Sequence, residues 1–218
     1  FHDGIISIAS SEFIANQLPQ LMNMPMVVIN NYGVPVENIC SVDPDPYQES
    51  YLVLEHLKML GHRKIARIKL IPDFGTKRDL TRGDTEFMAA ANALNLHFSV
   101  ENFNYEKDSD LKEILHHVVS HGFTAIFMIH QHLAVSISSW LHSLKIAIPE
   151  DISLVTYEIP EVTEYLFPPQ TTLDFDFPEI ARIAVELLRK RMKGEMVPVS
   201  IKAMVKLNVR SSTKKINK

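Results

Sequence analysis

The sequence has 218 residues, of which 46% are hydrophobic and 22% are charged, and its formal net charge is −4. This length and composition exclude a chain that is disordered throughout, and they leave room for one large domain or two small ones. The acidic balance argues against a nucleic-acid-binding surface, because neutralising phosphates requires a dense basic face.

The first half of the chain alternates short apolar runs with helical patterns. Gly61 stands just past the end of one predicted helix, where a left-handed cap residue is favoured. In chain order we expect a strand over 5–9, a helix over 12–22, a strand over 26–29, a polar loop over 30–38, a helix over 47–60 and a strand over 65–70.

The second half continues the alternation. Pro178 opens the clearest helix, which ends in a basic turn before Gly194. We expect helices around 87–94, 111–118 and 133–144, strands over 124–129 and 152–157, an extended connector over 168–172, a half-exposed alternating strand over 199–209 and a mobile tail from 211 onward. Strands that alternate with helices in this way predict an α/β fold around mainly parallel sheets.

The single cysteine, Cys40, excludes an internal disulfide and fits a reducing compartment. No apolar run approaches the length of about 18 residues that a membrane-spanning helix needs, and the start at Phe1 lacks a signal-peptide pattern. We therefore expect a cytoplasmic protein with no membrane partner. Because the sequence runs from Phe1 directly into the apolar stretch 4–9 without a methionine, we expect its start to be a cut rather than a natural N-terminus.

Several segments follow one another in a recognisable order. They include LKMLGHRKIA at 57–66, IPEDISLV at 148–155, PPQTTL at 168–173 and VRSST at 209–213. In sequence and in order, over nearly the whole chain, they resemble the lac repressor/galactose repressor (LacI/GalR) family of bacterial transcription regulators. The resemblance implies the ligand-sensing part of a DNA-binding repressor, which is not an enzyme and has no cofactor.

The resemblance also implies a two-lobe, periplasmic-binding-protein-like (type I) fold with parallel sheets flanked by helices. The first lobe would be incomplete, because the match starts midway through it. It implies a homodimer that binds operator DNA through an N-terminal headpiece outside this chain. The expected lobes are 1–44 plus 173–195 and 45–172 plus 196–212, with a flexible tail at 213–218 and crossings near 43–45, 171–174 and 196–199.

Candidate ligand-binding residues follow from the strands, because ligands of open α/β sheets lie outside the carboxyl ends of the strands. A small sugar-like effector would suit the polar side chains found there. The candidates that directly follow predicted strands, or lie in the loops after them, are Phe74, Arg82, His130, Gln131 and Glu158.

These positions depart from the family pattern, which puts the usual sugar in doubt. Arg82 lies one residue from the expected spacing, His130-Gln131 stands where Asn-Asp is expected, and Glu158 replaces an aspartate. Three of the candidate residues also have a structural alternative. Arg82 could be a solvated helix-start residue, His130 could bond a neighbouring carbonyl, and Phe74 could be a packing anchor.

Other functions have weaker sequence support. His117 and His121 share a helix face as two metal ligands would, but no third ligand stands at standard spacing, so a solvated helix end is the better interpretation. No glycine-rich nucleotide loop and no G-x-S-x-G motif occurs. The alternative to a regulator is a solute-binding protein of a sugar transport system, and a metabolic enzyme comes third.

Overall fold

The computed structural model describes residues 3–8, 16, 19–30, 39–70, 83–95, 99–105, 108–129 and 133–216. The chain divides into two compact units, and each is built from two stretches of sequence. Unit 1 comprises 1–45 and 175–205, and unit 2 comprises 46–174 and 206–218.

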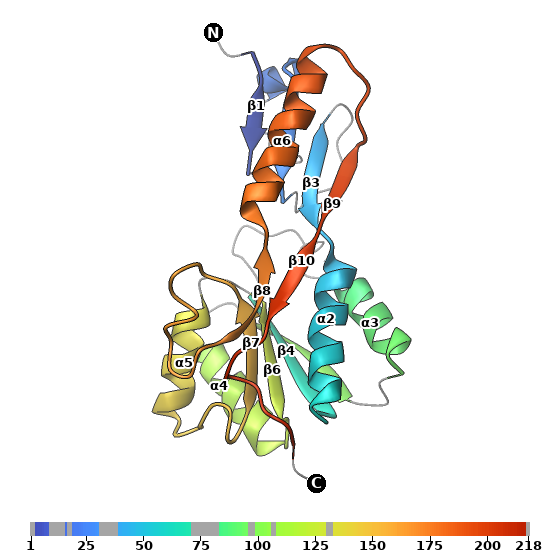
Figure 1. Cartoon of the computed structure of the whole chain (residues 1–218). Coiled ribbons are helices and arrows are strands. Elements are labelled where there is room, and N and C mark those ends of the chain that lie inside the picture. Colours follow the sequence, from blue (N-terminus) through green and yellow to red (C-terminus); the bar gives the residue numbers. More distant parts are fainter. Residues whose placement is uncertain are drawn as a thin grey trace. The chain divides into compact units, whose positions relative to one another are not determined.

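Unit 1 is a four-stranded sheet covered by one long helix (Figure 1). The strands lie in the order β1-β2-β3-β9, and each neighbouring pair is parallel. The elements of unit 1 are β1 (Ile5–Ser7), the 3-10 helix η1 (Pro19–Asn23), β2 (Met26–Ile29), β3 (Cys40–Pro44), α6 (Phe177–Met192) and β9 (Ser200–Ala203).

Helix α6 is the element that the sequence specifies most completely. Asp176 caps it by accepting a 3.1 Å hydrogen bond from the amide of Glu179, and Pro178 occupies its first turn. Ile180, Ala184 and Leu187 recur on one face and pack on Val27, Cys40 and Val42 of the sheet. The helix predicted from Pro178 is thus confirmed, and its apolar face forms the core of unit 1.

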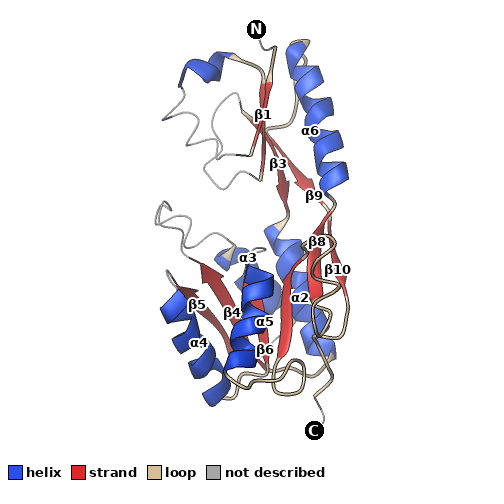
Figure 2. Ribbon diagram, turned by 90° about the vertical axis from the view of Figure 1, so that its left-hand side faces the viewer, coloured by secondary structure: helices blue, strands red, loops and turns tan. Residues whose placement is uncertain are grey.

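Unit 2 is a six-stranded sheet with helices on both faces (Figure 2). Its strand order is β10-β8-β7-β6-β4-β5, and β4 to β8 are parallel. The elements are α2 (Pro46–Met59), β4 (Lys64–Leu70), α3 (Asp84–Ala93), β5 (Ser99–Tyr105), α4 (Asp108–Ser120), β6 (Ala125–Ile129), α5 (Leu133–Ser143), β7 (Ser153–Tyr157), β8 (Thr171–Phe175) and β10 (Val205–Asn208).

The two faces of this sheet carry separate cores. Helices α2 and α3 pack on one face around Ile65, Phe87 and Phe127, whereas α4 and α5 pack on the other around Ile68 and Ile126. Successive strand residues point to opposite faces, so β4 and β6 contribute to both cores. β6, with the sequence AIFMI, is a continuous apolar run because both of its faces are buried.

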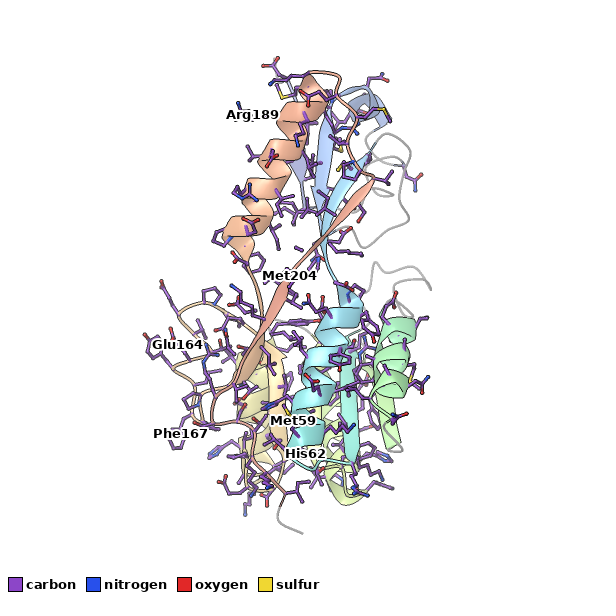
Figure 3. All side chains as sticks on the ribbon, turned by 45° about the vertical axis from the view of Figure 1, so that its right-hand side comes forward. Met59, His62, Glu164, Phe167, Arg189 and Met204 are labelled. Atoms are coloured by element: carbon purple, nitrogen blue, oxygen red, sulfur yellow. The ribbon has the colours of Figure 1, made fainter. Side chains whose placement is uncertain are left out.

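The predicted strand over 199–209 is corrected in two respects. It breaks at Met204, which lies between β9 and β10 (Figure 3). β9 pairs with β3 in the sheet of unit 1, with Ser200 opposite Ser41, and only β10 joins unit 2. The third crossing therefore lies at 205–206 rather than near 196–199. The other two boundaries lie at 45–46 and 174–175, against the expected 44–45 and 172–173.

Four more elements differ from the expectations. β3 and β5 were not predicted, and the connector over 168–172 ends in strand β8. β3 contains the polar pair Ser41 and Asp43, yet it is buried because their side chains bond each other at 2.6 Å. The helix predicted over 12–22 lies largely outside the described residues, and its end is the 3-10 helix η1.

The tail predicted as flexible over 213–218 is instead attached to unit 2 up to Ile216. The amide of Ile216 donates to the carbonyl of Leu60 at 2.8 Å, and the Lys214 amide donates to Ser153 Oγ at 3.1 Å. His62 lies in the turn that follows α2 (Figure 3), and its Nε2 atom is 3.1 Å from the carbonyl oxygen of Lys214. These bonds order the segment because they satisfy its backbone polar groups.

Candidate functional site

The carboxyl ends of the parallel strands β4 to β7 lie at one edge of the unit 2 sheet. Two groups of polar side chains gather there, one on each face. We call them the Glu158 cluster and the Arg67 cluster. The Glu158 cluster consists of Glu158, Thr163, Thr172, Asn208 and Arg210. The Arg67 cluster consists of Arg67, Lys69 and Asp84.

The Glu158 cluster joins three strands. Glu158 directly follows β7, and its carboxylate accepts hydrogen bonds from Thr163 and Thr172. Asn208 Nδ2 donates to Glu158 Oε2 at 3.1 Å, and Arg210 Nη1 donates to the same oxygen at 2.9 Å. Since Thr172 belongs to β8 and Asn208 to β10, this one carboxylate ties the two strands to β7.

The charge of Glu158 is stabilised although the residue is only 7% exposed. Burial by itself raises the pKa of its carboxyl group, but the donors on Arg210, Thr163, Thr172 and Asn208 together outweigh burial. They lower the pKa from 4.5 to about 2. Glu158 is therefore ionised over the whole physiological pH range.

The cluster also reaches the crossing between the units. Asn208 Nδ2 lies 3.3 Å from Asp174 Oδ2, at the residue where unit 2 passes into unit 1. Arg210 Nη1 donates to the Gln170 carbonyl at 2.8 Å, which fixes the start of β8. The described contacts thus assign Glu158 a structural role, while its predicted role in ligand binding stays a prediction.

The Arg67 cluster lies on the α2 and α3 face. Arg67 and Lys69 are two residues apart on β4, so both side chains point to that face. Arg67 Nη1 donates to Asp84 Oδ1, and Lys69 Nζ donates to the same oxygen at 3.0 Å. Asp84 is the first residue of α3, where a negative charge is favoured by the helix dipole.

A third polar contact lies on the same face. Tyr157, the last residue of β7, donates from its hydroxyl to Glu49 Oε2 at 2.7 Å. Its ring meets Phe127 edge-on, with the centroids 6.1 Å apart. The apolar core of this face therefore gives way to polar groups as the strands approach their carboxyl ends, which is the arrangement of a site for a polar ligand.

Four of the five predicted site residues lie outside the described residues: Phe74, Arg82, His130 and Gln131. Their roles stay predictions, and only Glu158 is placed by the structure.

Arg67, Lys69 and Asp84 were not among the predicted residues. The signal for the two cations was present, because Arg67 and Lys69 alternate with apolar residues inside the strand predicted over 65–70. A charged side chain inside a buried strand needs a partner. No local pattern identifies Asp84 as that partner, because it lies 17 residues from Arg67.

The metal hypothesis gains no support from the part of the chain that the structure describes, where no three His, Cys, Asp or Glu residues are grouped as metal ligands. The rings of His117 and His121 stack with centroids 3.8 Å apart, and His121 Nδ1 donates to the His117 carbonyl at 2.9 Å. Within the residues that the structure describes, no helix has the length and apolar character needed to cross a membrane.

Comparison with known proteins identifies similar chains. The HTH-type transcriptional repressor PurR of Vibrio vulnificus is 28% identical over 221 residues, which cover 99% of this chain and 65% of that protein. The ribose operon repressor of Haemophilus influenzae is 26% identical over 195 residues, which cover 88% of this chain and 58% of that protein. The chain thus spans about three fifths of the length of these curated relatives.

Solved structures share the fold. A LacI family transcriptional regulator from Enterococcus faecium, with bound ribose, superimposes with a TM-score of 0.80 at 22% identity, covering 99% of this chain and 81% of that one. The transcription regulator CcpA of Lactococcus lactis gives a TM-score of 0.78 at 24% identity, covering 97% and 78%. The predicted type I periplasmic-binding-protein-like fold is therefore confirmed.

A family match completes the assignment. Residues 54–213 match the periplasmic binding protein-like domain family. This range contains nearly all of unit 2 and extends through α6 and β9 of unit 1. The chain belongs to the periplasmic binding protein-like domain family.

Proposed function

We propose that this chain is the ligand-sensing domain of a bacterial DNA-binding transcription regulator of the repressor type, and that it responds to a small polar metabolite, a sugar or a sugar derivative. The observation that carries the proposal is family membership over 54–213. The relatives named above support it, since they are repressors and one solved regulator holds ribose.

The site supports a sensor better than an enzyme. Glu158 and Asp84, two of the carboxylates at the carboxyl edge, each accept hydrogen bonds from cationic side chains. An acid or base for catalysis needs a pKa near the working pH, whereas Glu158 has a pKa of about 2. We therefore propose that the chain binds its ligand and does not transform it.

The mechanism would be a shift between two conformations of the chain. The ligand stabilises the conformation that binds it more tightly. The coupling free energy between ligand binding and a second binding event is typically about 1–3 kcal/mol. We propose that operator DNA is bound by a separate headpiece, that the regulator acts as a homodimer, and that it works in the cytoplasm.

A thermal-shift screen of the purified protein against pentoses and hexoses tests the sensor function. A ligand present at 100 times its dissociation constant stabilises the folded state by about 2.7 kcal/mol, which raises Tm by about 5–10 °C for a chain of this size. Sorbitol at the same concentration controls for a general osmolyte effect, since it lacks the ring of a sugar.

DNA binding is tested with the product of the full gene, by recovering the genomic fragments that it binds with and without the stabilising sugar. A sugar that raises Tm and changes the recovered fragments supports a regulator. A sugar that raises Tm while no fragment is bound favours the solute-binding alternative. A screen in which no sugar raises Tm more than sorbitol does contradicts the sugar-sensing proposal.

A further inference from the structure

Two aromatic side chains of unit 2 are exposed on the loop that joins β7 to β8. Phe167 is 97% exposed and Tyr165 is 77% exposed, and Phe167 lies on the outer side of this loop (Figure 3). A third apolar side chain, Val209, is 60% exposed on the segment that follows β10. We call these three residues the aromatic surface. Exposed apolar groups of this kind mark sites of contact with another chain, and aromatic residues are enriched at such sites.

Two hydrogen bonds join the segment that carries Val209 to the end of the loop. The amide of Ser212 donates to the carbonyl of Pro169 at 3.0 Å, and the amide of Arg210 donates to Thr171 Oγ1 at 3.0 Å. The two stretches of chain therefore run side by side. The aromatic surface accordingly spans two adjoining segments of unit 2, although these are about forty residues apart in the sequence.

The loop is held in one conformation by its own hydrogen bonds. The amide of Tyr165 donates to the carbonyl of Val162 at 3.0 Å, and the amide of Gln170 donates to the carbonyl of Thr163 at 3.0 Å. Thr163 is buried, and its hydroxyl donates to the carboxylate of Glu158. Because these bonds fix the backbone on both sides of the exposed rings, covering the rings costs little additional conformational entropy.

The exposed area is large enough to form the centre of a stable contact between proteins. A fully buried aromatic side chain removes about 150–250 Å² from water, so Phe167 and Tyr165 together supply about 300–400 Å². One partner of a standard protein interface contributes about 800 Å². The two rings would therefore provide nearly half of that area, and large aromatic side chains at the centre of an interface carry much of its binding energy.

The charges around the aromatic surface favour a second copy of this chain as the partner. The loop carries exposed carboxylates at Glu161 and Glu164, and the tail beyond Ser212 carries exposed ammonium groups at Lys214 and Lys215. A two-fold contact brings the same surface of both copies together. A surface with both signs of charge can then pair its carboxylates with the ammonium groups of the other copy, whereas a surface of one sign would repel itself.

We propose that the aromatic surface is a contact between two copies of this chain, with Phe167 and Tyr165 at its centre and the charged side chains of the loop and the tail at its rim. This inference rests on the homodimer of the proposed function, and it names the surface through which the copies of unit 2 associate. Burial of the two rings provides the affinity, and the charges at the rim fix the orientation of the copies.

Sedimentation velocity of the full gene product over a range of concentrations tests the inference. We expect the wild type to form dimers, and we expect Phe167→Ser to raise the dimer dissociation constant tenfold or more. Tyr165→Ser should act in the same direction, and the double variant should sediment as a monomer. Met196→Ser is the matched control and leaves the dissociation constant unchanged, because Met196 is a fully exposed apolar side chain of unit 1. Circular dichroism establishes that each variant is folded.

Phe167→Trp reports directly on burial at this position. Tryptophan keeps a large aromatic ring on the loop, so this variant should remain dimeric. After subtraction of the tryptophan emission of the wild type, the emission of the new ring should shift to shorter wavelength as the protein concentration rises, because the ring leaves water on dimerisation. Met196→Trp should show no such shift.

The outcomes separate this inference from the proposed function. If the wild type is a dimer and the double variant dimerises as tightly, the inference is overturned while the homodimer stands. If the wild type is a monomer at every concentration, the homodimer and this contact both fail. The sensor function is decided separately by the thermal-shift screen with sugars. Emission of Phe167→Trp that does not change while the variant dimerises would also count against the inference.

Discussion

Replacing Glu158 by glutamine removes the charge that holds β7, β8 and β10 together while keeping the shape of the side chain. The pKa of Glu158 falls from 4.5 to about 2 on folding. At 1.36 kcal/mol per pKa unit, this difference corresponds to about 3 kcal/mol of stability at neutral pH. The loss is of this order because Arg210, at 2.9 Å, would face a neutral amide in a buried setting.

The pH dependence has a definite sign. Because the folded-state pKa lies below the unfolded value, the unfolded chain takes up the proton first as the pH falls. The contribution of Glu158 is therefore complete above pH 4.5 and is lost between pH 4.5 and about pH 2. Glu158→Gln should lose stability at pH 7 and should show a shallower fall in stability over the acidic range than the wild type does.

Urea unfolding followed by tryptophan fluorescence measures both effects. The only tryptophan of the sequence, Trp140, lies in α5 of unit 2 and reports on the unit that contains Glu158. Glu164→Gln is the matched control, because Glu164 lies on the same loop (Figure 3) and is exposed. A free energy of unfolding equal in the two variants to within about 0.5 kcal/mol would refute the assigned role of Glu158.

Three further predictions concern stability in urea. Burial lowers the pKa of His62 from 6.5 to about 4. The free energy of unfolding should therefore fall by about 3 kcal/mol as the pH falls from 6.5 to 4. His62→Gln should make this fall in stability with pH shallower. Gly83→Ala should lower the free energy of unfolding by at least about 1 kcal/mol more than Gly122→Ala does. Both glycines have a positive φ, but only at Gly83 would the added Cβ lie close to another side chain, 3.1 Å from Arg67 Nη2. Equal losses of stability in the two variants would contradict this steric argument. Ser212→Ala should cost about 2–3 kcal/mol, because its hydroxyl bonds one carbonyl and one amide. Ser211→Ala, at an exposed position, should be nearly neutral, and a similar loss at both serines would show that the tail bonds contribute little.

The sequence by itself determined the fold class, the family and the best-defined helix. Alternation of apolar runs and helical patterns is a local property, so it could be read without any knowledge of contacts. Helix α6 was predicted from Pro178 and its apolar face because capping and amphipathicity act within a few residues. Glu158 was singled out in the same way, as a polar residue directly after a buried strand, but its predicted role in ligand binding stays a prediction.

Only the tertiary structure decided which partners these residues meet. The segment after Val199 looks like one strand, but pairing with β3 assigns its first half to unit 1. Thr213 to Ile216 look solvated, yet Leu60 and Ser153 bind their backbone. Asp84 becomes the partner of Arg67 only because α3 folds back over β4. Such contacts join residues that are distant in the sequence, so no local periodicity, charge pattern or capping signal encodes them, and the packing of the whole chain selects them.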